Sequence, residues 1–290
     1  MKNNTLNKTK NGRASLIISR TVCYLVLILI TLMCVFPFYI LAVNSSRSGI
    51  KIDSGFSGLF SNYFMINFKN LLKMKEYPVM RALLNSLIIA GGCAILTTYF
   101  SAMTAFGLHL YNFKFKNAAF IFIMAIMMIP TQVSTLGFLK LIYFLNLMDN
   151  YIPLIVPSIA APIVFFFMKQ YMESILPFEI VEAARIDGSN EFRTFNLIVI
   201  PIIKPAIAVQ AIFAFVASWN NYFVPALVIN SLQKKTIPLL VAAFRGADYA
   251  KFDSGVVYML MFIAIIPALI IYLFLSKFII RGITLGSVKG

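Results

Sequence analysis

Charged residues are scarce in this chain, at only 12% of its 290 residues. A soluble domain carries about twice that share. Hydrophobic residues make up 60% of the sequence, and several windows of about 20 residues contain no charge, which is the length that crosses a bilayer as a helix. The composition therefore excludes an ordinary soluble domain and predicts an all-α integral membrane protein embedded in the lipid bilayer.

Acidic residues are fewer than basic ones: the chain has 10 Asp and Glu and 25 Lys and Arg, which gives a net charge of +15. No basic patch interleaves with exposed aromatic residues, so we expect no nucleic-acid partner. In a membrane protein, Lys and Arg flank the spanning helices and set their orientation. The excess of positive charge therefore carries topological information.

Sequence patterns typical of metal-binding and nucleotide-binding sites are also absent. Cys23, Cys34 and Cys93 all lie inside apolar runs without metal-ligand spacing, and the single histidine, His109, lies at an expected helix end. The phosphate-binding pattern G-x-x-x-x-G-K-[ST] does not occur. We therefore expect no metal or cofactor on this chain, and any energy for its activity must come from a partner.

Six apolar segments are long enough to be spanning helices, at about 21–43, 85–108, 117–139, 150–169, 203–229 and 254–276. We expect Pro130 to kink the third of them. The central part of every segment lacks Asp, Glu, Lys, Arg and His. Ion-coupled carriers and intramembrane enzymes usually place such groups at membrane depth, so this absence argues against both classes.

The polar segments between the spans predict one transmembrane domain over residues 1–290. The basic tails 1–20 and 277–290 carry five and three Lys or Arg, whereas the short connection before Asn150 carries one, Lys140. The bias of positive charge toward the cytoplasm places both tails and the segment 170–201 inside the cell. The segments 44–84 and 230–253 are then external loops.

Neutral polar residues lie inside the apolar segments and form two candidate linings for a path. Thr97, Ser101 and Thr104 share one helix face at spacings i, i+4 and i+7, and Gln132 lies in the third span. They can pack helices together or line a path for an uncharged polar solute such as a sugar. Asn220 and Asn221 follow Trp219, whose ring can stack on a sugar or anchor the helix at the interface.

One polar segment separates the fourth and fifth apolar runs and contains half of the acidic residues, five of ten, between Glu173 and Glu191. Glu182 and Arg185 can pair at i, i+3, and the small Ala183 and Ala184 allow another surface to approach closely. Gly188 suits a helix end, after which Ser189 can cap a second short helix that ends before Pro201. The product is a helix–turn–helix that is either a docking surface or a solvated amphipathic loop.

The spacing of this segment matches the pattern E-A-A-x3-G-x9-I-x-L-P, carried here by Glu182-Ala183-Ala184, Gly188, Ile198, Ile200 and Pro201. The one departure is Ile200 in place of leucine. The segment resembles the cytoplasmic loop of ABC importer permeases. The whole chain resembles the smaller membrane subunit of maltose-type carbohydrate importers, through its six spans, the Trp219-Asn220 region and the ending Gly282–Gly290.

This resemblance implies a non-enzymatic permease subunit of a bacterial cell membrane. Its coupling helix between the fourth and fifth spans would dock in a cytoplasmic dimer of ATP-binding subunits, which would hold ATP and Mg. Further implied partners are a second homologous permease subunit and an extracellular sugar-binding protein that meets the loop 230–253. The implied coupling residues are Glu182, Ala183, Ala184, Arg185, Asp187, Gly188, Ile198 and Pro201. The alternative is an ATP-independent secondary carrier or channel for an uncharged polar solute.

Overall fold

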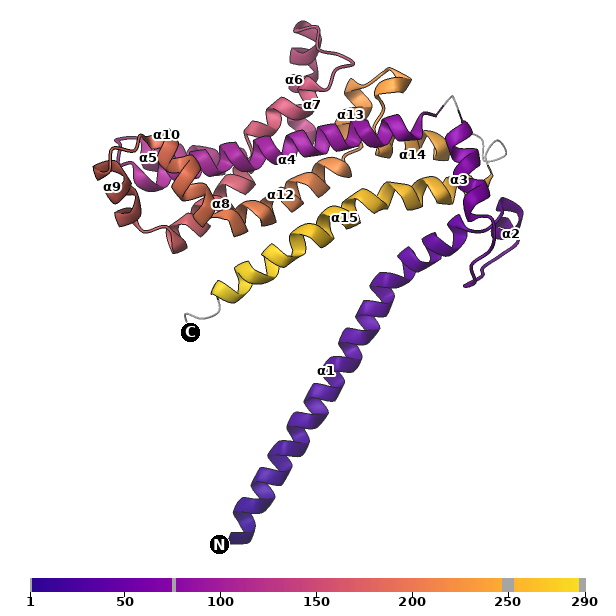
Figure 1. The fold of residues 1–290 in the computed structure, drawn as a ribbon, viewed down its shortest axis with the longest axis horizontal. Coiled ribbons are helices and arrows are strands. Elements are labelled where there is room, and N and C mark those ends of the chain that lie inside the picture. The colour runs from indigo at the N-terminus through magenta and orange to yellow at the C-terminus, as the bar shows by residue number, and fades with distance from the viewer. Residues whose placement is uncertain (1, 75–76, 247–252, 287–290) are drawn as a thin grey trace. The chain divides into compact units, whose positions relative to one another are not determined.

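The computed structural model describes residues 2–74, 77–246 and 253–286, and every regular element in these ranges is helical (Figure 1). The predicted all-α class is therefore confirmed. The chain divides into two compact units. The first comprises residues 1–71 and 249–262, and the second comprises residues 72–248 and 263–290. The division falls inside α3 (Phe64–Lys73) and α15 (Ser254–Gly286).

The first unit is built on α1 (Lys2–Ser45), a 44-residue helix with Pro37 in its interior. The short helices α2 (Gly49–Asp53) and α3 follow it. The apolar side chains of α1 from Ile18 to Tyr39 are mostly exposed. A helix with an uncovered apolar surface of this length is suited to lipid or to another membrane chain. The segment 44–84, which we expect to be an external loop, contains the two short helices α2 and α3.

A buried polar cluster ties the end of α1 to the elements that follow it. The side-chain amide of Asn67 donates hydrogen bonds to the carbonyl oxygens of Ser45 (2.9 Å) and Arg47 (2.8 Å). The carboxylate of Asp253 accepts a hydrogen bond from the Gly49 N–H at 3.1 Å. Buried polar groups are costly unless they are paired, and here each pairing joins segments distant in sequence. The cluster therefore fixes this end of the unit.

The second unit is organised along α4 (Val79–Leu110), which packs against α12 (Lys204–Trp219) and α8 (Pro162–Ile175) (Figure 1). Alanines at the contacts, such as Ala90, Ala102 and Ala105, are fully buried, and their small side chains let helix backbones approach closely. The remaining elements are α5 (Lys116–Ile126), α6 (Thr131–Phe144), α7 (Ile152–Ile155), η1 (Val156–Ile159), α9 (Phe178–Ile186), α10 (Glu191–Thr194), the π-helix η2 (Phe195–Val199), α11 (Ile200–Ile202), α13 (Phe223–Val228), η3 (Leu232–Lys234) and α14 (Ile237–Gly246).

Four helices among the described residues are long and apolar enough to cross a membrane, namely Ile18–Ser45, Val79–Leu110, Ile152–Ile175 and Ser254–Phe274. A fifth forms if Glu191–Ile202 and Lys204–Trp219, which meet at an angle of 83°, are counted as one bent span. We expected six. The multi-pass membrane architecture is confirmed, whereas the count of six is not reproduced.

The expected third span, 117–139, is divided in two rather than kinked. Helix α5 ends at Ile126, and Pro130 is the N-cap of α6. Proline has no N–H to donate to the carbonyl of Ile126, four residues earlier, and its ring clashes with a continuing helix. The predicted kink at Pro130 was therefore wrong in degree, because the helix breaks there.

Other boundaries also differ from the expectation. The fourth span runs to Ile175 instead of 169, and the fifth ends at Trp219, with α13 as a separate helix. The last helix, α15, continues to Gly286, well past the expected end at 276. The expected external loop 230–253 contains η3 and α14. Its residues 247–252, and residues 287–290 of the expected tail, lie outside the described residues.

Candidate functional site

The predicted docking helix is α9, and it presents two different faces. Val181 and Ala184 are buried, and Val181 joins the core that α4 and α8 share. Glu182 and Ala183 are exposed on the other side, and Ile186 is 87% exposed. We expected both alanines to face a partner. Because Ala184 packs into the chain itself, only Ala183 is left to permit the close approach of another surface.

Helix α9 ends in a Schellman motif centred on Gly188. The N–H of Ser189 donates to the carbonyl of Ala184 (2.9 Å), and the N–H of Gly188 donates to that of Arg185 (3.0 Å). Gly188 has a φ of +78°, in the left-handed region that residues with a Cβ rarely adopt. The chain leaves open space around the position of its missing Cβ. The predicted helix end at Gly188 therefore has a specific backbone requirement.

The second short helix, α10, is capped by Asn190 and not by Ser189 as we expected. The Asn190 side-chain oxygen accepts a hydrogen bond from the Arg193 N–H at 2.8 Å, the usual N-cap geometry. The sequence Ser189-Asn190 offers two capping residues in a row, so composition alone did not separate them. Ser189 instead accepts a hydrogen bond from the Thr194 hydroxyl at 2.9 Å, which closes the turn.

Arg185 pairs across the turn instead of along its own helix. Its Nε lies 2.7 Å from Oε1 of Glu191, where we expected Glu182 as the partner. The guanidinium also lies over the ring of Tyr111, 5.5 Å from its centre, at the end of α4. The Arg185 side chain thus links α9, α10 and α4, and the carboxylate of Glu182 stays on the exposed face.

The end of the segment is helical through Pro201, contrary to the expected stop before it. The π-helix η2 includes Ile198 and passes into α11, which contains Pro201. The chain then bends by 83° at Ile203, between α11 and α12. Pro205, near the start of α12, lacks the N–H that would continue the helix through this point.

Contacts with α4 and α8 hold this segment in place. His109 at the end of α4 stacks on Phe178, with ring centres 4.8 Å apart, and its Nε2 lies 3.2 Å from the carbonyl oxygen of Leu176. Phe195 packs on Phe106 of α4 with ring centres 5.3 Å apart. Closely packed interiors transmit displacement rather than absorb it. A push on α9 would therefore reach α4.

Side chains of α4 also donate hydrogen bonds to backbone carbonyl groups of α7, η1 and the start of α8, which together form an interrupted span that we call the broken span. The thiol of Cys93 donates to the carbonyl of Leu154 (3.2 Å), and the hydroxyl of Thr97 donates to that of Ser158 (2.9 Å). Residue 162 is proline, so Ser158 lacks its normal helical donor. Thr97 supplies the missing hydrogen bond. The hydroxyl of Ser101 reaches the carbonyl of Ala161 at a longer 3.4 Å.

Thr97→Val is expected to destabilise the folded chain by about 1–3 kcal/mol, the cost of leaving a buried acceptor unsatisfied. The matched control is Thr104→Val on the same helix, where the exposed hydroxyl donates a hydrogen bond to the carbonyl of Phe100 in its own turn. Thermal unfolding of the purified variants in detergent measures the difference. Equal midpoints for the two variants would contradict this role for Thr97.

Two cavities lie beside this broken span. The first, which we call the loop-side cavity, has a volume of about 500 Å³. Its lining residues are Ser86, Ile89, Ser134, Thr135, Phe138, Pro153, Leu154, Pro157, Ser158, Ser218, Asn221, Val224, Pro225 and Thr236. The second, the mid-helix cavity, has about 660 Å³ and extends along α12 past Gln210 and Phe213 to Thr97. The two share Leu154, Ser158, Ser218 and Asn221.

The candidate path residues have different positions in the structure. Asn221 lines both cavities, and Thr97 lines the mid-helix cavity. Trp219 is only 3% exposed, stacks on Phe215 at 5.6 Å and donates its indole N–H to the carbonyl of Ala264 (3.1 Å). The ring is thus part of the packing between helices. Among the other candidates, Ser101, Thr104, Gln132 and Asn220 line neither cavity.

Six polar residues that line the loop-side cavity were not among our candidate path residues: Ser86, Ser134, Thr135, Ser158, Ser218 and Thr236. Ser158 could have been suspected, because the prolines at 153, 157 and 162 forbid a regular helix around it and open backbone often lines cavities in membrane proteins. Single serines and threonines elsewhere in apolar segments carry no such signal.

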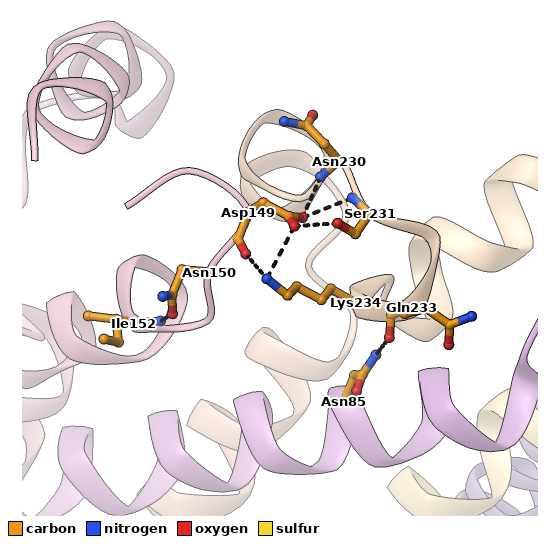
Figure 2. A network of polar contacts seen from close by, with 8 residues as sticks. All are labelled: Asn85, Asp149, Asn150, Ile152, Asn230, Ser231, Gln233 and Lys234. Atoms are coloured by element: carbon orange, nitrogen blue, oxygen red, sulfur yellow. Dashed lines mark hydrogen bonds and ion pairs between the residues drawn. The ribbon is translucent and has the colours of Figure 1, made fainter. Parts of the chain in front are cut away.

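A network of polar contacts, which we call the polar clasp, joins Asp149 to the segment from Asn230 to Lys234 (Figure 2). The Asp149 carboxylate accepts hydrogen bonds from the N–H groups of Asn230 (3.0 Å) and Ser231 (2.8 Å) and from the Ser231 hydroxyl, and it lies 3.2 Å from the Lys234 ammonium. These hydrogen bonds, those from Ser231 above all, hold the pKa of Asp149 well below its ordinary value. The lowered pKa keeps Asp149 ionised, and its ion pair with Lys234 intact, at a lower pH than an ordinary aspartate would allow.

Comparison with known proteins places the chain among transport components. The family described as binding-protein-dependent transport system inner membrane component matches residues 94–285. The arabinooligosaccharides transport system permease protein AraQ of Bacillus subtilis is 33% identical over 90% of this chain and 93% of its own length. The maltodextrin transport system permease protein MdxG of the same organism is 28% identical over 97% of this chain and 100% of its own length.

A third relative, the sn-glycerol-3-phosphate transport system permease protein UgpE of Brucella abortus, is 29% identical over 92% of this chain and 96% of its own length. Among solved structures, a chain of a bacterial ABC transporter involved in the import of the acidic polysaccharide alginate superposes with a TM-score of 0.77. The sequences are 22% identical, and the match covers 90% of this chain and 96% of that one. This chain has the same fold.

Proposed function

Because the chain belongs to the family of binding-protein-dependent transport system inner membrane components, we propose that it is the permease subunit of an ATP-driven carbohydrate importer. The proposal that this chain is driven by a partner rests on the two faces of α9, one exposed and one buried. The exposed face carries Glu182, Ala183 and Ile186, and the helix ends at the turn of Gly188. The buried face packs on the core that α4 and α8 share. The arrangement suits a helix that receives a push from a partner.

In this proposal a cytoplasmic dimer of ATP-binding subunits, which holds ATP and Mg, binds the exposed face of α9. Both chain termini and α9 lie on the cytoplasmic side, and the clasped loops at Asp149 and Ser231 lie outside. Closure of the dimer moves α9, and the contacts of His109, Phe178 and Phe195 pass that movement to α4. Helices of this chain and of a second permease subunit then rock to expose the path to the outside.

The solute reaches the path from an extracellular sugar-binding protein, and the external loops of this chain meet that protein. The names of the relatives support a carbohydrate solute but include neutral and charged molecules, because oligosaccharides, maltodextrin and glycerol 3-phosphate all occur among them. This chain provides walls and mechanical coupling, and chemistry belongs to the ATP-binding partner. The family assignment alone leaves the charge of the solute open.

Uptake by proteoliposomes tests this proposal. Vesicles that contain this chain with the second permease, the ATP-binding subunits and the sugar-binding protein should accumulate labelled neutral oligosaccharide only when ATP is present inside the compartment that the ATPases face. Vesicles that contain this chain alone should not. Accumulation by the chain alone, without ATP, would contradict the proposal and favour a secondary carrier or channel.

A further inference from the structure

The segment between α1 and α3 is held in place by polar contacts, yet it exposes large apolar side chains. Arg47 is only 7% exposed, and its guanidinium donates hydrogen bonds to the carbonyl oxygens of Lys51 and Gly55. The hydroxyl of Tyr39 donates to the carbonyl of Gly58 at 2.6 Å. The apolar side chains that stay exposed on this backbone, at 63–84%, are Ile50, Phe56, Leu59 and Phe60. A cluster of this kind marks an interaction surface.

Two of these rings fold back onto the last turns of α1. The ring centre of Phe56 lies 6.4 Å from that of Phe36, and the ring of Phe60 meets that of Tyr39 edge to face at 5.9 Å. A groove of about 490 Å³, which we call the α1 groove, lies at the same place. Its lining combines Phe56 with the first part of α15 and with Phe36, Pro37, Ile40 and Leu41 of α1. All of these belong to the first unit.

The α1 groove lies at the depth where acyl chains meet lipid headgroups. The span Ile18–Ser45 has 28 residues, so it is about 42 Å long, close to the thickness of a bilayer with its headgroups. Phe36 and Leu41 precede Ser45 by nine and four residues, which places the groove roughly 6–14 Å inside that end. Irregular backbone is not exposed to lipid within the hydrocarbon. The loop backbone therefore stays at headgroup level, and its apolar side chains reach the acyl chains.

A lipid fits this groove better than a helix of a partner protein. A helix with its side chains is about 10–12 Å across, so the groove volume would hold about one turn of it, whereas an acyl chain is thin and unbranched. No charged residue occurs among the described residues that line the groove. Only 6% of the apolar window of the α1 span is buried, so the groove is continuous with a surface that suits the bilayer.

An exposed lysine lies close to the groove. Arg47 holds the carbonyls of Lys51 and Gly55 together, and Gly55 precedes Phe56, so the Lys51 side chain projects from the same part of the loop. An ammonium group just beyond the end of a span attracts lipid phosphate. An apolar partner helix would offer it no such group. The apolar groove and the lysine therefore match the two ends of one phospholipid.

We propose that the α1 groove binds an acyl chain of a membrane phospholipid, with Phe56 against the chain and Lys51 at the phosphate. The lipid fills the space between α1, the loop and the start of α15, all of which line the groove. It thereby ties the first unit to the bilayer at the end of its long exposed helix. The phosphate is common to zwitterionic and anionic phospholipids, so the site accepts both.

The test isolates the complete importer from bilayers of phosphatidylethanolamine and phosphatidylglycerol and counts the lipids that survive detergent washing, by native mass spectrometry. Phe56→Ala should lower the occupancy of one retained phospholipid about tenfold, because the acyl chain loses its burial against an aromatic ring. The matched control is Leu59→Ala. Leu59 is 78% exposed and Phe56 is 76% exposed in the same loop, but Leu59 is not among the described residues that line the groove. It should keep the wild-type occupancy.

Met261→Trp fills the groove from α15 and leaves the loop unchanged, so it should displace the same lipid even if Phe56→Ala disturbs the loop. Equal occupancy in Phe56→Ala, Met261→Trp and Leu59→Ala would overturn the site. Lys51→Gln should lower the retention of both phospholipids, and unchanged retention would overturn the phosphate contact. The same count is made on this chain alone. A lipid that this chain retains alone but loses on assembly with the second permease would show that the partner occupies the groove, which would also overturn the proposal.

Discussion

Gly188→Trp should reduce ATP-driven uptake and the ATPase activity of the assembled importer to background, while the chain still inserts in the membrane. Gly188 lies in the left-handed region at φ +78°, and apart from its chain neighbours no described residue has an atom within 4 Å of an added Cβ. An added Cβ therefore meets no clash with the described residues and costs the backbone strain, roughly 1–2 kcal/mol. The indole itself would project into the space that we assign to the ATP-binding partner.

Gly188→Ala is the matched control, because it imposes the same strain without the bulk. We expect its uptake to stay close to that of the wild type. Uptake is measured in proteoliposomes, and insertion is measured by the amount of folded chain recovered from membranes. If Gly188→Trp transported at the wild-type rate, no partner would approach this turn closely and the proposed docking surface would be wrong.

Gly255→Val should prevent the first unit from folding. A Cβ at this position would lie 2.5 Å from the carbonyl oxygen of Arg47 and 2.7 Å from the amide nitrogen of Asn67. The carbonyl belongs to the backbone and cannot swing aside. Relief of the clash would displace the Asn67 amide from both of its carbonyl partners, so overpacking of about 1–3 kcal/mol is added to the cost of buried groups left unpaired.

Gly91→Val is the matched control, since Gly91 is also in a helix and an added Cβ there meets nothing within 4 Å. Both variants replace a helical glycine with valine. Thermal unfolding and size-exclusion profiles in detergent compare them. We expect Gly255→Val to aggregate and Gly91→Val to remain monodisperse, and equal behaviour would show that the polar cluster around Asn67 tolerates displacement.

The resemblance drawn from the spacing around Glu182 is confirmed by the family match, and the membrane class followed from the scarcity of charge alone. Both depend on local information. The helix end at Gly188 was likewise predictable, because few residues other than glycine suit a φ of +78°. The break at Pro130 was visible in the sequence, but its extent was not, since a proline can either kink or end a helix.

Pairings across the chain were the predictions that failed. Glu182 is the nearest acid to Arg185 along its helix, yet Glu191 is its partner, because the turn at Gly188 brings α10 back toward α9. For Trp219 the sequence left open a sugar platform or an interfacial anchor, and in the structure its ring packs on Phe215 and donates a hydrogen bond to the carbonyl of Ala264. The partner of each side chain depends on which helices pack together, and residue spacing along one helix does not predict that packing.

By itself, the sequence determined that this protein lies in a membrane and that the segment from Glu182 to Gly188 is a short helix that ends at a glycine. These properties follow from composition and from the conformational limits of single residues. Only the tertiary structure decided which face of that helix is free, and that Asn221 and Thr236 share a cavity wall with Ser158. Burial and cavity lining arise where helices distant in sequence pack together, and many sequences of similar pattern can pack differently.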